Sequence, residues 1–232
     1  MGADGSPTER IDRIAEEEIL RLLDREGVDW NFVSEEAGAV ERGGRETLVV
    51  DPIDGSSNAV RGFPFTSISL ALGRDTLDGI DIGVIHDLYR NSTFWAVRGE
   101  GAFRDGRRLR PRPFDPKREF LLVSLGRYSS EESLRHARRA RRARSLGCAS
   151  LEIASVAEGT ADGYYFNSSV DERNLRATDI AAAYRILREA GGGLEDAHGR
   201  SIDDFPLGVE RRTSLFAWGD PAYRAAFPER SR

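Results

Sequence analysis

One short stretch, Asp51-Pro52-Ile53-Asp54-Gly55-Ser56, constrains this chain more than any other. It follows the apolar, β-branched run 47–50, which predicts a buried strand ending at Asp51. Two carboxylates three residues apart, with a proline fixing the backbone between them, predict a tight turn that binds a hard cation through oxygen. Gly55 would let a phosphate approach the backbone, and Ser56 would cap a following helix whose amides favour an anion. By itself the stretch is equally compatible with an ordinary Asp-Gly turn.

Further acidic residues flank other predicted elements. They are Asp12 in a predicted helix at 11–23, Glu35 and Glu36 after a predicted strand at 30–33, and Asp179 opening a predicted helix at 180–190. Each has an ordinary explanation when taken alone. A Glu-Glu pair is usually solvated, and an Asp at a helix start is usually a cap.

The rest of the chain predicts a mixed α+β protein rather than a strict βαβ alternation. Apolar runs predict strands at 66–72, 80–85, 92–97, 120–125, 162–166 and 213–218. Helical spacing predicts helices at 131–144, 151–157 and 221–227. Residues 2–7 are expected to form a loop, with Ser6 or Thr8 capping the first helix, Gly27 ending it, and Gly191 to Gly193 ending the helix at 180–190.

Charge and cysteine content exclude several classes of protein. The 232 residues carry a formal net charge of -5, so general nucleic-acid binding is not expected. The arginine run at 138–144 lacks interleaved aromatics and predicts a solvated helix face. Cys148 is the only cysteine, which excludes an internal disulfide framework and fits a reducing cytoplasm.

Neither a bilayer-spanning run nor a signal peptide is visible. His86, His136 and His198 match no metal motif and are expected to be structural or surface residues.

Taken together, these motifs resemble the inositol monophosphatase family, especially its archaeal-type members that also hydrolyse fructose 1,6-bisphosphate. The matching segments, in order, are 2–8 with Asp12, 33–36, 51–58, 62–65, 99–103, 147–152, 178–182 and 189–192. The resemblance implies an αβαβα layered sandwich of the sugar-phosphatase type. It implies one domain over 1–232, with approximate lobes at 1–125 for the metals and 126–232 for the substrate.

The resemblance also implies a role for each site residue. Glu35, Asp51, Asp54 and Asp179 would bind metal through their side chains, and Ile53 through its backbone carbonyl. Asp12 and Ser56 match the pair that orients and activates the attacking water. The amides of Gly55 and Ser56 would hold the phosphate, and the segment Gly147, Cys148 and Ala149 would contact the polyol. Cys148 is expected to pack beside the site without a catalytic role. The cofactor would be two or three Mg²⁺ ions, with Mn²⁺ as an alternative.

The expected function is hydrolysis of a small sugar or inositol phosphate, namely inositol 1-phosphate, fructose 1,6-bisphosphate or both. Metal ions would offset the charge of the dianionic ester, lower the pKa of a bound water and stabilise the departing alkoxide. The displacement would be in line, without a covalent intermediate. One alternative is a 3′(2′),5′-adenosine bisphosphate phosphatase, which needs a base-stacking pocket. The other is a silent phosphate-binding or regulatory module, against which the retained acidic residues argue. We expect a cytoplasmic homodimer without nucleic-acid or membrane partners.

The sequence departs from the family pattern at several places. Members usually carry a further N-terminal helix before the segment that matches Gly2, so we expect Met1 to be an internal methionine of a longer protein. Ser56 stands where many members have threonine, which keeps the hydroxyl. Thr178 stands where many have tryptophan. The stretch 167–174 matches poorly at the place where specificity contacts are expected, which leaves the substrate open.

Overall fold

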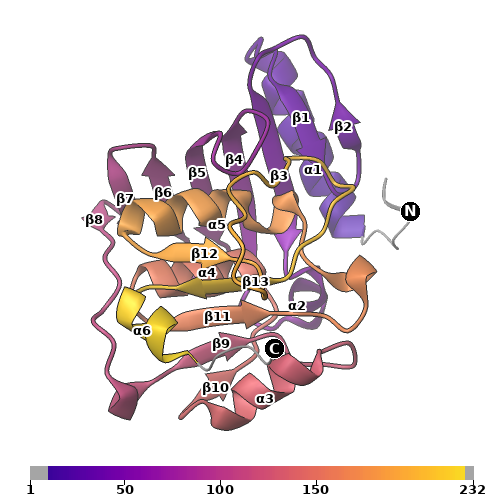
Figure 1. The fold of residues 1–232 in the computed structure, drawn as a ribbon. Helices are drawn as coiled ribbons and strands as arrows, with labels where there is room; N and C mark the ends of the chain where they lie inside the picture. The colour runs from indigo at the N-terminus through magenta and orange to yellow at the C-terminus, as the bar shows by residue number, and fades with distance from the viewer. Residues whose placement is uncertain (1–9, 228–232) are drawn as a thin grey trace.

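Two β-sheets form the framework of the computed structural model, which describes residues 10–227 (Figure 1). The first sheet has eight strands, in the order β2 (Gly38–Val40), β1 (Asn31–Ser34), β3 (Thr47–Asp54), β4 (Ser67–Gly73), β5 (Ile80–Asp87), β6 (Ser92–Val97), β7 (Gly101–Arg104) and β8 (Arg107–Arg108). The second has five, in the order β10 (Ala143–Arg144), β9 (Leu121–Val123), β11 (Gly163–Phe166), β13 (Leu215–Trp218) and β12 (Gly193–Glu195). The loop expected at 2–7 and the caps Ser6 and Thr8 lie outside the described residues.

Helices separate and cover the two sheets. Helix α1 (Arg10–Arg25) packs on β3, α4 (Ala149–Ala157) and α5 (Ala177–Ala190) lie between the sheets, and α3 (Glu131–Arg139) and α6 (Pro221–Ala226) cover the second sheet (Figure 1). The short elements are α2 (Ser56–Arg61) and two 3₁₀ turns, η1 (Pro116–Arg118) and η2 (Asp171–Arg173). The expected αβαβα layering is confirmed.

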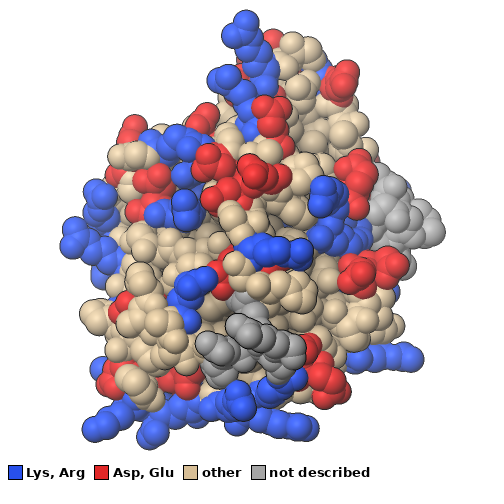
Figure 2. Space-filling model, viewed as in Figure 1, with Lys and Arg blue, Asp and Glu red and all other residues tan. Residues whose placement is uncertain are grey.

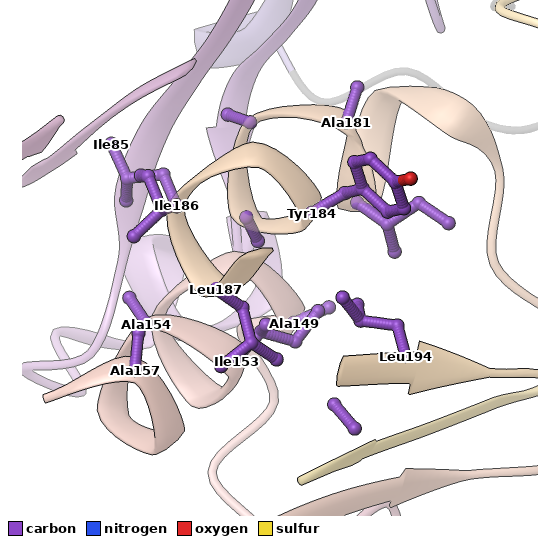
Figure 3. Close-up of a cluster of buried hydrophobic side chains, with 14 of the residues drawn as sticks. Ile85, Ala149, Ile153, Ala154, Ala157, Ala181, Tyr184, Ile186, Leu187 and Leu194 are labelled. Carbon is purple, nitrogen blue, oxygen red and sulfur yellow. The ribbon is translucent and has the colours of Figure 1, made fainter. Parts of the chain in front are cut away.

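The core is centred on α5, which is buried between the sheets. Figure 3 shows Ile186 of α5 facing Ile85 of the first sheet, and Leu187 facing Ile153 of α4. Helix α5 approaches the first sheet closely where its alanine run meets Gly83 of β5. A Cβ at Gly83 would lie 2.5 Å from the carbonyl oxygen of Ala182, so a larger residue would not fit there. Burial of this apolar surface is the main stabilising contribution to the fold.

Parallel strand pairs bring chemically important loops to common edges. Strands β1 and β3 run parallel, so Glu35 and the Asp54 end of β3 lie at the same edge of the first sheet. In the second sheet β9 pairs in parallel with both β10 and β11. The loops that follow these three strands therefore share an edge, which is where ligands commonly bind in parallel sheets.

The helix expected at 131–144 is shorter than predicted. It ends at Arg139, because Ala140 has the extended dihedrals φ −60° and ψ 140°, and residues 143–144 pair with β9 as strand β10. The arginines of this run are all exposed, and Figure 2 shows basic side chains gathered along the lower edge of the molecule. Strands β2, β7, β8 and β12, each two to four residues long, were not predicted.

The helix ends and the helix lengths can also be compared with the sequence-based expectations. Gly27 and Gly191 both follow helix ends with positive φ, as expected of helix-terminating glycines. Across residues 10–227, the helices are all too short or too polar to cross a membrane. The division into lobes at 1–125 and 126–232 stays a prediction.

Candidate active site

Asp51 and Asp54 lie in one continuous strand, β3, rather than in a turn after it. The strand does not end at Asp51 as expected, because it continues through Pro52 to Asp54. Asp51 pairs with Ser69 and Asp54 pairs with Ser67. An advance of three residues along β3 is therefore matched by only two residues along β4, which is a β-bulge. Side chains alternate between the faces of a strand, and a spacing of three would ordinarily separate the two carboxylates. The β-bulge brings both onto one face.

Gly55 follows directly and adopts φ 84° and ψ 38°, a left-handed conformation that favours glycine. A Cβ at this position would lie 3.1 Å from the carbonyl oxygen of Gly147 and 3.2 Å from Cβ of Cys148. Gly55 is the N-cap of α2, so the prediction that Ser56 caps this helix is wrong. Ser56 is instead the first helical residue, since the chain has already turned at the glycine.

Asp179 comes from the first turn of α5 rather than from its start. The helix begins at Ala177, and the Asp179 carboxylate accepts the backbone N–H of Arg176 at 2.6 Å as part of a capping box. The Arg176 guanidinium is buried and forms an ion pair with Glu35 over 2.6 Å. One buried arginine thus connects the two predicted ligands that come from opposite halves of the chain.

The predicted ligands and catalytic residues line one cavity of about 150 Å³. Its lining consists of Asp12, Glu35, Glu36, Asp51, Pro52, Ile53, Asp54, Gly55, Ser56 and Asp179. Asp12, which is 8% exposed, reaches it from α1. The structure therefore brings together the seven predicted metal-binding and catalytic residues, and Gly55 with them.

Burial and mutual repulsion raise the pKa values of these acids. Burial, followed by the charges of Asp179 and Glu36, raises the pKa of Glu35 to about 7. Burial raises the pKa of Asp179 to about 6, with the charge of Asp54 adding to the effect. The pKa values of Asp51 and Asp54 are also raised, chiefly by burial. The charge of Arg212 acts in the opposite direction and lowers the pKa of Glu35.

The cavity fits a hard divalent cation. The carboxylates among its lining residues supply oxygen ligands of the kind that Mg²⁺, Mn²⁺ and Ca²⁺ prefer. A bound cation would relieve the like-charge repulsion that raises these pKa values. Among residues 10–227, no group of three or more acidic, histidine or cysteine side chains is arranged as a metal site in this structure. Protein donors instead engage Asp51, Asp54, Asp179 and Glu35.

The predicted substrate segment Gly147, Cys148 and Ala149 adjoins this cavity at the start of α4. Asp54 accepts the backbone N–H groups of Ala149 at 3.2 Å and Ser150 at 2.7 Å. Cys148 is 1% exposed, and its Sγ lies 3.2 Å from Oγ of Ser67. Burial raises its pKa well above the usual range, which fits the predicted packing role.

Sequence reasoning missed three residues that hold the site together. The Asn58 amide donates to the carbonyl oxygens of Phe65 at 2.9 Å and Leu146 at 2.8 Å. Glu152, buried in α4, accepts the backbone N–H of Leu146 at 3.0 Å. Asn58 belongs to the matched motif and could have been singled out for that reason. Nothing in the local sequence marks Glu152 or Arg176 as buried.

The three predicted histidines lie away from the cavity. His136 is buried against aromatic rings, with its ring centroid 4.3 Å from that of Phe227. His86 forms a hydrogen bond with Thr93 over 2.9 Å. His198 lines a different cavity.

Comparison with known proteins agrees with this geometry. The profile of the inositol monophosphatase family matches residues 2–222. A protein of Methanothermobacter thermautotrophicus named fructose-1,6-bisphosphatase/inositol-1-monophosphatase is 36% identical, over 95% of this chain and 81% of its own length. A Methanococcus maripaludis protein named bifunctional NADP phosphatase/NAD kinase is 31% identical, over 93% of this chain and 41% of its own length. A solved structure of an extragenic suppressor from Pyrococcus furiosus has a TM-score of 0.77 at 30% identity, over 94% of this chain and 85% of that one. The chain belongs to the inositol monophosphatase family.

Proposed function

We propose that the protein is a Mg²⁺-dependent phosphomonoesterase that hydrolyses inositol 1-phosphate, fructose 1,6-bisphosphate or both. One observation carries the proposal: four carboxylates from three separate chain segments line one cavity beside the glycine–serine start of α2. Membership of the family makes the chain a phosphoric monoester hydrolase of a metal-dependent group. The relatives' names supply the class of substrate.

The residues of the cavity would have three roles: metal binding, orientation of water and binding of the substrate. Glu35, Asp51, Asp54, Asp179 and the carbonyl of Ile53 would hold two or three Mg²⁺ ions, with Mn²⁺ as an alternative. Such ions would offset the charge of the ester and lower the pKa of a bound water. Asp12 and Ser56 orient the attacking water by hydrogen bonding. The amides of Gly55 and Ser56 bind the phosphate oxygens, and Gly147 to Ala149 position the alcohol.

The alternatives make different demands on the site. A silent binding module has no need of four carboxylates whose pKa values are raised by burial and by mutual repulsion. An adenosine bisphosphate phosphatase needs an aromatic surface for the base, and among residues 10–227 no aromatic residue lines the acidic cavity. We therefore place the sugar and inositol phosphates first. A homodimer and a cytoplasmic location stay predictions.

The test is phosphate release from a panel of inositol, sugar and nucleotide phosphates, with Mg²⁺ and with EDTA. We expect Mg²⁺-dependent release that Asp51→Asn abolishes. Ser57→Ala is the matched control, because Ser57 is exposed on α2 and does not line the cavity. If the wild-type protein released no phosphate from any ester in the panel, the enzyme proposal would be wrong.

A further inference from the structure

Three buried polar side chains lie next to Asp54 without lining the acidic cavity. They are Ser67 of β4 and Cys148 and Ser150 at the start of α4, which are 0%, 1% and 0% exposed. Ser67 is the residue that pairs with Asp54 where β3 runs beside β4. The β-bulge therefore sets a buried serine directly against a proposed metal ligand.

Ser67 connects β4 with the two polar side chains of α4. Its Oγ lies 2.8 Å from Oγ of Ser150 and 3.2 Å from Sγ of Cys148. These partners follow Ser67 by 83 and 81 residues in the chain. A buried hydroxyl is destabilising unless it is hydrogen-bonded, so this contact between distant segments satisfies polar groups that would otherwise oppose folding.

Both side chains of α4 act in turn on Asp54. Burial raises the pKa of Asp54, while hydrogen bonds from the Ser150 hydroxyl and the Cys148 thiol act in the opposite direction. The backbone N–H groups of Ala149 and Ser150 donate to the same carboxylate at 3.2 Å and 2.7 Å. The start of α4 thus supplies Asp54 with donors from its main chain and from its side chains.

The number of available hydrogens sets the direction of these hydrogen bonds. An ionised carboxylate only accepts, and a serine hydroxyl has a single hydrogen to donate. Because the Ser150 hydroxyl donates to Asp54, it accepts the hydrogen of Ser67. The order of donation is therefore from Ser67 to Ser150 to Asp54, and buried hydrogen bonds in such a series strengthen one another.

We propose that Ser67 is a positioning residue, which acts through Ser150 to hold the Asp54 carboxylate in the orientation that binds a divalent cation. Hydrogen bonds from outer residues orient metal ligands in this way, and their loss typically weakens metal binding. The inference rests on the proposed function and deepens it, because it makes metal affinity depend on two hydroxyls that do not line the cavity.

The experiment measures binding of Mn²⁺ alone by electron paramagnetic resonance, in which the signal of the free ion is lost on binding. Ser67→Ala and Ser150→Ala both keep the backbone N–H groups that donate to Asp54. Each should lower the Mn²⁺ affinity by about 10-fold or more. In the double variant the loss should be smaller than the product of the two single losses, because both hydroxyls act through one series of hydrogen bonds.

Thr66→Val is the matched control. Thr66 precedes Ser67 in the chain and is equally buried, and within the part of the chain that the structure describes its hydroxyl has no hydrogen-bond partner. This variant removes a buried hydroxyl and should leave the Mn²⁺ affinity unchanged. Should Ser67→Ala fail to fold, Ser67→Cys supplies the test, because the thiol is a weaker hydrogen-bonding group and should give a smaller loss.

Unchanged Mn²⁺ affinity in a folded Ser67 variant overturns the inference, and so do losses that multiply in the double variant, which would indicate independent effects on packing. Either result leaves the proposed function intact if the wild-type protein releases phosphate. A wild-type protein that binds Mn²⁺ but releases no phosphate from any ester contradicts the proposed function, while the affinities of the variants still decide for or against the role of Ser67. A wild-type protein that binds no Mn²⁺ overturns the inference as well.

Discussion

The carboxylate of Asp54 accepts the backbone N–H of Ser150 at 2.7 Å, although 96 residues separate the two in the chain. Ser150 lies in the first turn of α4, next to the segment expected to contact the alcohol. Asp54 therefore belongs to the candidate metal site and also fixes the start of α4. Asp51, by contrast, accepts the N–H of Ile53 in its own strand.

This difference predicts that two isosteric substitutions have unequal effects on stability. Asp51→Asn and Asp54→Asn should both abolish phosphate release. In EDTA, Asp51→Asn should be the more stable by about 1–3 kcal/mol, because it relieves repulsion without removing the charged acceptor of the α4 amides. Urea unfolding monitored by circular dichroism gives the free energy of unfolding for each variant. Equal values for the two variants would show that the Asp54 contact to α4 is energetically unimportant.

The raised pKa values predict how the metal-free protein responds to pH. Folding raises the pKa of Glu35 from 4.5 to about 7 and that of Asp179 from 3.8 to about 6. The folded state then binds these protons more tightly than the unfolded state, so their contribution is fully present below about pH 4 and is lost as the pH rises through 6 and 7. We expect the unfolding temperature in EDTA to fall over that range.

Added Mg²⁺ should reverse this trend, because metal binding requires deprotonated carboxylates and becomes stronger as the pH rises. Glu35→Gln should reduce the fall of the metal-free unfolding temperature near pH 7, since it removes the group whose pKa is about 7. Differential scanning calorimetry at a series of pH values provides the measurement. A metal-free unfolding temperature that climbed between about pH 5 and 8 would contradict the assignment of these shifts.

Asn58 should act on substrate binding through the segment it holds. Asn58→Ala leaves the carbonyl oxygens of Phe65 and Leu146 without this donor and should cost about 1–3 kcal/mol of stability. Because the released segment is expected to contact the alcohol, KM should rise more than kcat falls. Steady-state kinetics on inositol 1-phosphate, with Ser57→Ala as control, separates the two parameters. A fall in kcat at constant KM would instead place Asn58 in the chemical step.

The single cysteine should be chemically inert in the native protein. Cys148 is buried and its raised pKa keeps the thiol protonated, whereas alkylation requires the thiolate. Iodoacetamide at neutral pH should therefore leave activity unchanged until the protein is unfolded. Mass spectrometry of native and urea-treated samples measures the modification. Rapid native alkylation that inactivates the enzyme would mean that the segment at 147–149 opens frequently.

Local pattern predicted the elements that carry Asp51 and Asp179, because both elements have strongly patterned sequences. The run at 47–50 marked β3, and the helical spacing after Asp179 marked α5. Pattern did not predict that β3 continues past Pro52, because the bulge depends on pairing with β4, a tertiary contact. For the same reason the helix at 131–144 was predicted too long: parallel pairing of β10 with β9 overrides helical propensity there.

Arg176 illustrates a second limit. An arginine three residues before an aspartate reads as an exposed charge, and its burial follows only from packing between Glu35 and α5. The same holds for Glu152, whose acceptor role depends on the path of the loop before α4. Such residues become visible only after the fold has brought distant segments together.

The acidic residues of the cavity come from distant segments of the chain, which has a consequence for folding during synthesis. The four carboxylates predicted to bind metal are made in the order Glu35, Asp51, Asp54 and Asp179, and the last of them emerges late in synthesis because chains are made from the N-terminus onward. Until α5 inserts between the two sheets, a nascent chain lacks Asp179 and also lacks Arg176, which forms the ion pair with Glu35. Tight uptake of metal should thus report completed folding, and truncated products of interrupted translation should be unable to capture the ion.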